Sequence, residues 1–338
     1  AAAAMFPWFG ASAAVHGTRE EILGTEAVWQ FPPEAPKGLL FLAHGCNHGA
    51  IDFWPQSAAC TQCIGLPEEV RITKETLRAG WAVIAISSAD RAGSRCWSIE
   101  SDGPAVAGAL GKFRQAHGIT ALPLAAMGAS SGGAFVLQLP QLVPGLRAVV
   151  SQIMAIPPQM LISQGNQPFP PALFVHMARD TRTAALVDKC VRKLNRSGLK
   201  AAALEAPPLA IDDAYFSRRV GGLGGGASQR LRRVLDKAGL LDGAGKLTED
   251  PRGSAWREAV RGAAGLVEQL PGVAPAVADS LQADESAVAE ELNVAWAMHE
   301  ITADFMAQTL AWIESKGVTL EAEVKAEDAE GRSVLAEL

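Results

Sequence analysis

The chain has 338 residues, with 30 Lys and Arg against 36 Asp and Glu, which gives a net charge of −6. Hydrophobic residues make up 49% and charged residues 20%, a composition typical of globular proteins and too apolar for a disordered chain. The acidic balance argues against a general nucleic-acid binder. No uncharged apolar run reaches the ~18 residues that a membrane span needs, so we expect no membrane span.

In the first two thirds of the chain, short apolar runs alternate with helical segments. Runs of this length are typical of strands that are buried on both faces of a parallel sheet. The expected strands are 27–31, 39–43, 81–85, 122–127, 148–153, 173–177 and 200–204, and the expected helices between them are 68–79, 104–117, 132–139 and 183–197. The alternation predicts an α/β fold with a doubly wound, mostly parallel sheet.

Beyond residue 204 the pattern changes to helices after a glycine-rich stretch, 221–226. The expected helices there are 228–238, 254–264, 286–298 and an amphipathic final helix, 299–316. We therefore predict three parts: the N-terminal part of an α/β core, a helical cap or lid insertion with a possible glycine hinge, and a return to the core, with the ranges 1–206, 207–290 and 291–338. A basic run in the insertion is interpreted as a solvated helix face: Arg218, Arg219, Arg230, Arg232, Arg233 and Lys237.

The sharpest motif is Gly128-Ala129-Ser130-Ser131-Gly132, which matches G-x-S-x-G between an apolar strand and a helix. This context predicts a tight turn that lifts a nucleophilic serine above the sheet, because only small residues fit two positions before and after it. The helix then directs its N-terminal amides at developing negative charge. The flanking glycines favour Ser130 as the nucleophile, with Ser131 as the second candidate.

A serine hydroxyl needs a base to remove its proton. In proteins that carry a nucleophilic serine on this type of turn, the acid and then the histidine follow the serine along the chain. Only His176 and His299 follow the serine here. His176 lies inside an expected strand, so His299, at the expected start of the final helix, is the candidate base. Asp180 follows the strand 173–177 and is the candidate acid that orients the imidazole. Its other reading is a helix N-cap, and Asp188 is the fallback.

The tetrahedral oxyanion of acyl transfer needs two amide donors. The amide of Ser131 is one candidate. The loop after strand 39–43 reads His44-Gly45-Cys46-Asn47-His48-Gly49, and His-Gly after an apolar strand is typical of an oxyanion loop. We expect the amide of Cys46 as the second donor, with Gly45 as the alternative donor and substrate contact. A plain β-turn is the other reading.

Four of the five cysteines, Cys46, Cys60, Cys63 and Cys96, fall within 51 residues. They admit three readings: disulfides that brace loops at the mouth of the site and indicate an oxidising compartment, reduced thiols, or a zinc site with only one CxxC pair. The pairing is not readable from the sequence. Nearby, Phe53, Trp54 and Trp97 are candidate walls of a substrate pocket, with ordinary packing under the loops as the alternative.

The runs FLAHGCNHGAIDFWP, CIGLPEE, SSADRAGSRCW, MGASSGG, PPALFVHMARD and EELNVAWAMHEIT together resemble a plant and green-algal branch of the α/β-hydrolase superfamily. The resemblance spans about residues 27–316. It implies a central eight-stranded, mostly parallel sheet and a serine hydrolase with Ser130, Asp180 and His299 in the catalytic positions. It implies no substrate. The helical insertion lies between Asp180 and His299, which departs from a simple member of the superfamily.

From these residues we expect a serine hydrolase that cleaves a small carboxylic ester through an acyl-enzyme and needs no metal or cofactor. Esters are preferred over amides because most superfamily members with no extra domain are esterases, an argument by analogy. Thioesters and short peptides stay open. The alternative is a ligand-binding or signalling protein that keeps the fold with a slow or silent triad.

Overall fold

The computed structural model describes residues 15–271, 281 and 286–318. Its centre is an eight-stranded sheet in the order β1-β2-β4-β3-β5-β6-β7-β8. Only β2 runs against the other strands: it pairs antiparallel with β1 and β4, and all later pairs are parallel. The strands are β1 (Thr18–Ile22), β2 (Thr25–Gln30), β3 (Leu39–Ala43), β4 (Ala82–Ile86), β5 (Leu124–Ala129), β6 (Val149–Gln152), β7 (Ala172–Met177) and β8 (Ala201–Ala206).

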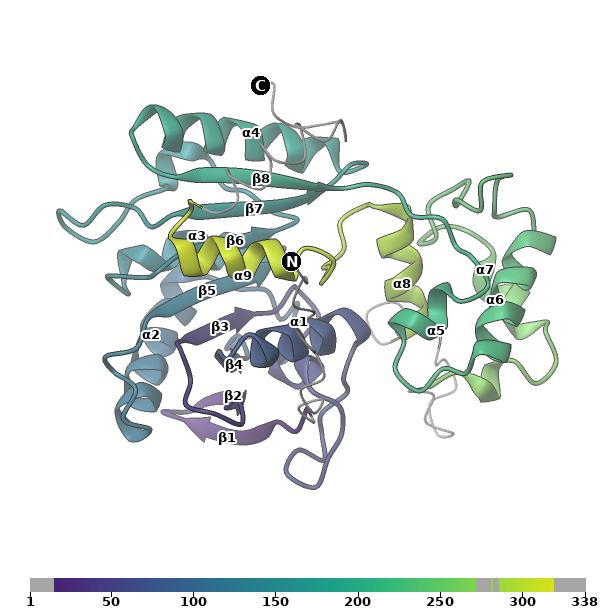
Figure 1. Cartoon of the computed structure of the whole chain (residues 1–338), viewed down its shortest axis with the longest axis horizontal. Coiled ribbons are helices and arrows are strands. Elements are labelled where there is room, and N and C mark those ends of the chain that lie inside the picture. Colours follow the sequence, from purple (N-terminus) through teal and green to yellow (C-terminus); the bar gives the residue numbers. More distant parts are fainter. Residues whose placement is uncertain (1–14, 272–280, 282–285, 319–338) are drawn as a thin grey trace, which may run out of the picture.

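Helices cover both faces of this sheet, as Figure 1 shows. One face packs α2 (Ile99–Ala116), α3 (Ser131–Gln138) and α4 (Thr181–Arg196), and the other packs α1 (Pro67–Arg78) and α9 (Met306–Ser315). Successive side chains of a strand point to opposite faces, and β3 shows why its sequence has no polar side: Phe41 joins the first core and Leu42 the second. The all-apolar runs therefore form strands that are buried twice.

A separate helical unit lies beside the sheet (Figure 1) and has its own hydrophobic core. Its helices are α5 (Tyr215–Arg219), α6 (Gly225–Lys237), α7 (Trp256–Arg261) and α8 (Ala287–Trp296). Phe216, Leu231 and Trp256 are buried at its centre. The chain enters this unit after β8 and leaves it through α8, which leads back to the sheet.

Several elements differ from the sequence-based expectations: α5 was not expected, and α2 begins five residues earlier than expected. The strand β1 was not expected, because its sequence, TREEI, is mostly charged; it is an edge strand that pairs with β2 across a turn at Leu23 and Gly24, both with positive φ. The final helix was expected from residue 299 but begins at Met306. His299 lies instead in the loop before it, with a φ of 47°, a conformation that is incompatible with a continuing helix.

Candidate active site

Ser130 sits on a sharp turn between β5 and α3, with φ 52° and ψ −119°. Such a backbone is costly for a residue with a side chain and is found where the surrounding structure enforces it. Close packing explains the flanking glycines: a Cβ on Gly128 would collide with the backbone of Gly132, and a Cβ on Gly132 would collide with the carbonyl oxygens of Ala43 and His44. The motif therefore presses the start of α3 against the end of β3.

Three side chains far apart in the sequence meet at this turn. The Ser130 Oγ lies 3.0 Å from His299 Nε2, and His299 Nδ1 lies 2.8 Å from Asp180 Oδ2. With Nδ1–H donating to the carboxylate, Nε2 is left to accept the serine proton. The His299 side chain is 39% exposed and the Asp180 side chain is 8% exposed, so the chain of hydrogen bonds runs from a buried carboxylate to an accessible imidazole.

Asp180 makes the contacts that both interpretations of its sequence position require. It is the N-cap of α4, where Oδ1 accepts from the Thr183 amide at 3.1 Å, while Oδ2 faces His299. Burial raises the pKa of the Asp180 carboxyl, but the hydrogen bonds from His299 and Thr183 outweigh it and bring the pKa below its usual value. The carboxylate is thus ionised where an imidazolium would form beside it.

The other candidates for these positions lie elsewhere. Ser131 is the first residue of α3, and its buried Oγ has no hydrogen-bond partner among the described residues. His176 is buried in β7 near Glu205. Asp188 pairs with Arg192 on the exposed side of α4. The structure brings none of these three to the Ser130 hydroxyl.

The loop that carries His299 is tied to both sheet and helices by residues that sequence reasoning did not single out. Gln152, at the end of β6, exchanges two hydrogen bonds with the Thr302 backbone at 2.8 and 2.9 Å. The buried Glu68 of α1 accepts from the Ala303 amide at 2.8 Å. Each contact joins residues about 150 or more positions apart in the sequence, so no local sequence pattern predicts these hydrogen bonds.

The loop after β3 lies against the serine: a Cβ placed on Gly45 would be 3.8 Å from the Ser130 Cβ. Within the described chain, the amides of Cys46 and Ser131 donate to no acceptor. His44 fixes the loop, since its Nδ1 donates to the Gly45 carbonyl at 2.6 Å and its Nε2 accepts from the Ser88 amide at 3.0 Å. Burial lowers the His44 pKa to about 4, so this imidazole is neutral.

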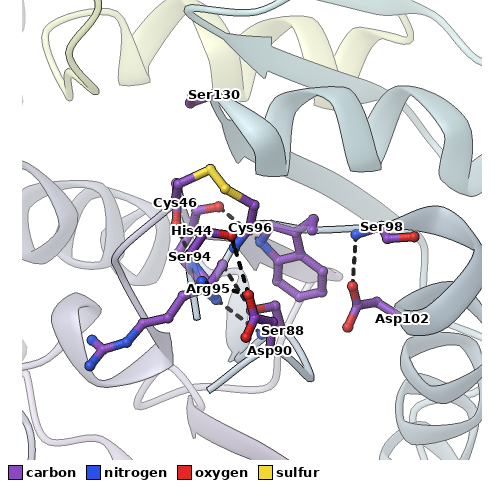
Figure 2. The surroundings of a disulfide bond; sticks show 12 residues. His44, Cys46, Ser88, Asp90, Ser94, Arg95, Cys96, Ser98, Asp102 and Ser130 are labelled. Carbon is purple, nitrogen blue, oxygen red and sulfur yellow. Dashed lines mark hydrogen bonds between the residues drawn. A yellow bond between two sulfur atoms is a disulfide. The ribbon is translucent and has the colours of Figure 1, made fainter. Parts of the chain in front are cut away.

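A disulfide between Cys46 and Cys96 joins the same loop to the segment after β4, and Figure 2 shows it between Ser130 and the neighbouring loop residues. A second disulfide, Cys60–Cys63, is buried. The disulfide interpretation of the four clustered cysteines is confirmed, and the zinc and reduced-thiol readings are wrong because the sulfurs are paired with one another. Cys190 is a buried free thiol.

The three aromatic candidates for a pocket wall belong to the packing beneath the loops. Phe53 and Trp54 are 1% and 0% exposed and lie in a sheet-face core. Trp97 stacks on Phe135 and donates from Nε1 to the His44 carbonyl at 2.9 Å. Trp97 thus supports the candidate oxyanion loop, and Phe53 and Trp54 do not present an open surface to a ligand.

The basic run of the insertion is a solvated face only in part, and Arg219 is the exception. Its guanidinium, 12% exposed, pairs with Glu291, with Glu68 at 3.1 Å and with Asp304 at 3.0 Å. Burial lowers the Arg219 pKa, but these carboxylates outweigh it and raise the pKa well above its usual value. The arginine joins the helical unit to α1 and to the loop before α9.

A group of acidic side chains is buried where α8 meets α1. Glu69 of α1 and Glu290 of α8 are 4% and 7% exposed and carry oxygens without hydrogen-bond partners. Burial raises the Glu69 pKa to about 7, against the lowering effects of Glu290 and of the His48 charge. For His48, burial lowers the pKa, but the hydrogen bond to Asp52 prevails and raises it to about 9.

Neither a metal-binding cluster of three His, Cys, Asp or Glu side chains nor a helix able to span a bilayer occurs in the described ranges.

No protein-family model matches the chain, and no curated protein matches it in sequence. Solved structures do resemble it. A Bacillus coagulans carboxyl esterase, in complex with glycerol, is 11% identical over 57% of this chain and 90% of its own, with a TM-score of 0.43.

An esterase/lipase from an uncultured bacterium is 14% identical over 66% of this chain and 84% of its own, with a TM-score of 0.39. TT1662 from Thermus thermophilus is 19% identical over 57% and 90%, also with a TM-score of 0.39. At such identities the similarity concerns the fold alone. The strand order and the single antiparallel strand β2 define an α/β-hydrolase fold with a mostly parallel eight-stranded sheet.

Proposed function

We propose that the protein is a serine hydrolase that cleaves carboxylic esters through an acyl-enzyme on Ser130, with His299 as general base and Asp180 as the orienting acid. The observation that carries the proposal is the continuous hydrogen-bond chain from the Ser130 hydroxyl through the His299 ring to the Asp180 carboxylate. The strained serine backbone at the strand-to-helix turn supports the same assignment, because strain of this kind clusters at functional sites.

In the proposed reaction His299 Nε2 takes the Ser130 proton while Oγ attacks the ester carbonyl carbon. The negative charge on the carbonyl oxygen is stabilised by the Ser131 and Cys46 amides, which have no acceptor among the described residues, and by the N-terminal end of α3. Collapse of the intermediate expels the alcohol, which receives the proton from His299. Water, deprotonated by the same ring, then releases the acid.

The proposal has three further parts. The helical insertion, expected over 207–290, would act as a cap beside the site, with the glycine-rich stretch 221–226 as a hinge; its separate core supports an independent unit. Membership of the plant and green-algal branch rests on the sequence runs quoted above. The choice of small esters over thioesters or peptides rests on analogy with the fold's esterases.

Fluorophosphonate labelling, together with a panel of p-nitrophenyl esters of graded chain length, tests the proposal. We expect the wild type to be labelled and to hydrolyse short esters, and Ser130→Ala to lose labelling and at least ~10³-fold of turnover. Ser131→Ala is the matched control, because the neighbouring hydroxyl does not contact His299; it should keep most of the labelling. A folded wild type with neither labelling nor turnover would favour the alternative, a binding protein with a silent triad.

A further inference from the structure

Arg252, in the helical insertion, reaches across to the backbone of the loop that carries His299. Its Nη1 donates to the Met298 carbonyl at 2.8 Å, and its Nη2 donates to the His299 carbonyl at 2.9 Å. Weaker contacts connect it to Glu300 at 3.5 Å and to Asp250 at 3.9 Å. A guanidinium presents its donors in a rigid plane, so one side chain holds two consecutive carbonyls.

The backbone that Arg252 contacts includes and adjoins residues with left-handed φ values. Ala297 and His299 both have left-handed φ values, 58° and 47°, which are unfavourable for residues with a Cβ. Other contacts hold the loop on either side: the Arg179 amide donates to Ala297, and Gln152 holds Thr302. Across the described ranges, Arg252 provides the hydrogen bonds to the carbonyls of residues 298 and 299.

Hydrogen bonds within the insertion hold the backbone turn that carries Arg252. The Asp250 carboxylate accepts from the Arg252 amide at 2.9 Å, and the Gly253 amide closes the turn on the Asp250 carbonyl at 3.1 Å. The buried Trp256 donates to the Pro251 carbonyl at 3.0 Å from within the core of the helical unit. The backbone position of Arg252 is therefore set by the packing of the insertion.

We infer that Arg252 is a positioning residue through which the helical insertion holds His299 in reach of Ser130. The inference rests on the proposed function, and it gives the insertion a task beyond covering the site. A misplacement of about 1 Å in a reacting group can cost ~10²-fold in rate. Removing the guanidinium while leaving the triad intact should therefore lower kcat far more than it changes KM.

The test compares Arg252→Ala with Arg230→Ala. Arg230 is a matched control, because it also donates to two consecutive carbonyls, those of Ala264 and Gly265, but entirely inside the insertion. With p-nitrophenyl acetate we expect Arg252→Ala to lower kcat by 10- to 100-fold with KM within about twofold. We expect Arg230→Ala to leave both near the wild-type values, and millimolar methylguanidine to restore part of the Arg252→Ala rate.

A second readout does not depend on activity. The proton on His299 Nδ1 gives an NMR resonance that reports its hydrogen bond to Asp180; His299→Gln assigns it. We expect this resonance to broaden or shift in Arg252→Ala and to be retained in Arg230→Ala. If both variants keep wild-type kcat and the same resonance, Arg252 does not position the histidine. If the wild type proves inactive, the proposed function fails, while the resonance still tests the positioning role.

Discussion

The α-carbon of Gly132 faces the carbonyl oxygen of Ala43 so closely that a methyl group on it would overlap that oxygen. This contact joins the first turn of α3 to the end of β3, so the serine turn and the candidate oxyanion loop form one unit. We predict that Gly132→Ala destabilises the protein by about 1–3 kcal/mol, the usual range for overpacking, and abolishes most ester hydrolysis. Urea unfolding and an esterase assay measure the two effects.

Gly111→Ala is the control for that substitution, because a methyl group there would meet open space on α2. Alanine is the better helix former by about 1 kcal/mol, so this variant should be as stable as the wild type or more so. An equal loss of stability in both glycine variants would contradict the steric account of the serine turn.

Asp180→Asn should reduce turnover by ~10³- to 10⁴-fold while changing KM little, because an amide in place of the carboxylate neither fixes the His299 tautomer nor stabilises the imidazolium. The variant keeps an N-cap oxygen for the Thr183 amide, so its melting temperature should stay close to that of the wild type. Steady-state kinetics with a short p-nitrophenyl ester gives the comparison.

Asp188→Asn, on the exposed side of α4, is the control for the acid and should keep wild-type turnover. A fall in Asp188→Asn equal to that in Asp180→Asn would remove the basis for choosing Asp180.

Arg219→Ala should be the most damaging single change in the basic run. It leaves the fully buried carboxyl group of Glu291 without its cationic partner, while Glu68 keeps its ion pair with Arg71. Removing one member of a buried ion pair typically costs about 3–5 kcal/mol. Its sequence neighbour Arg218 pairs with Asp212 on the surface, so Arg218→Ala should cost less than ~1 kcal/mol. Chemical denaturation of both variants measures the two costs in free energy of unfolding, and equal costs would contradict the predicted difference between the buried and the surface arginine.

Stability should fall as pH rises through the range in which buried Glu69 keeps its proton. Its pKa is about 7 in the folded protein against 4.5 when exposed, so between these values the folded state binds more protons than the unfolded state. The free energy of unfolding then decreases with pH, by at most about 1.4 kcal/mol per pH unit from this group. Glu290, Asp52, Glu300 and the cationic His48 surround it.

Glu69→Gln should flatten that slope: the variant and the wild type should be similarly stable near pH 4.5, and the variant more stable at pH 8. Glu75→Gln, on the exposed side of the same helix, is the control and should follow the wild-type pH dependence. Urea midpoints measured across pH 4.5–8 decide the matter, and parallel curves for Glu69→Gln and the wild type would contradict the prediction.

The sequence predicted the elements whose signal is local. The run 39–43 is apolar throughout because the strand is buried on both faces, and the glycines beside Ser130 mark a turn that only small residues allow. The strand β1 escaped prediction because an edge strand needs no apolar side. The start of α9 was misplaced because tertiary contacts to Glu68 and Gln152 hold the preceding residues outside a helix. Arg252 could not be found, because its task depends on which segments the fold brings together.

One ten-residue helix belongs to two hydrophobic interiors: Leu292 of α8 packs in the core of the helical unit, and Val294, two residues on, packs against the sheet. Deleting the helical unit would remove one of the two packing partners of this helix and, with it, the fixed path of the chain toward residue 299. A shortened protein should therefore lose the order of the site as well as the helices.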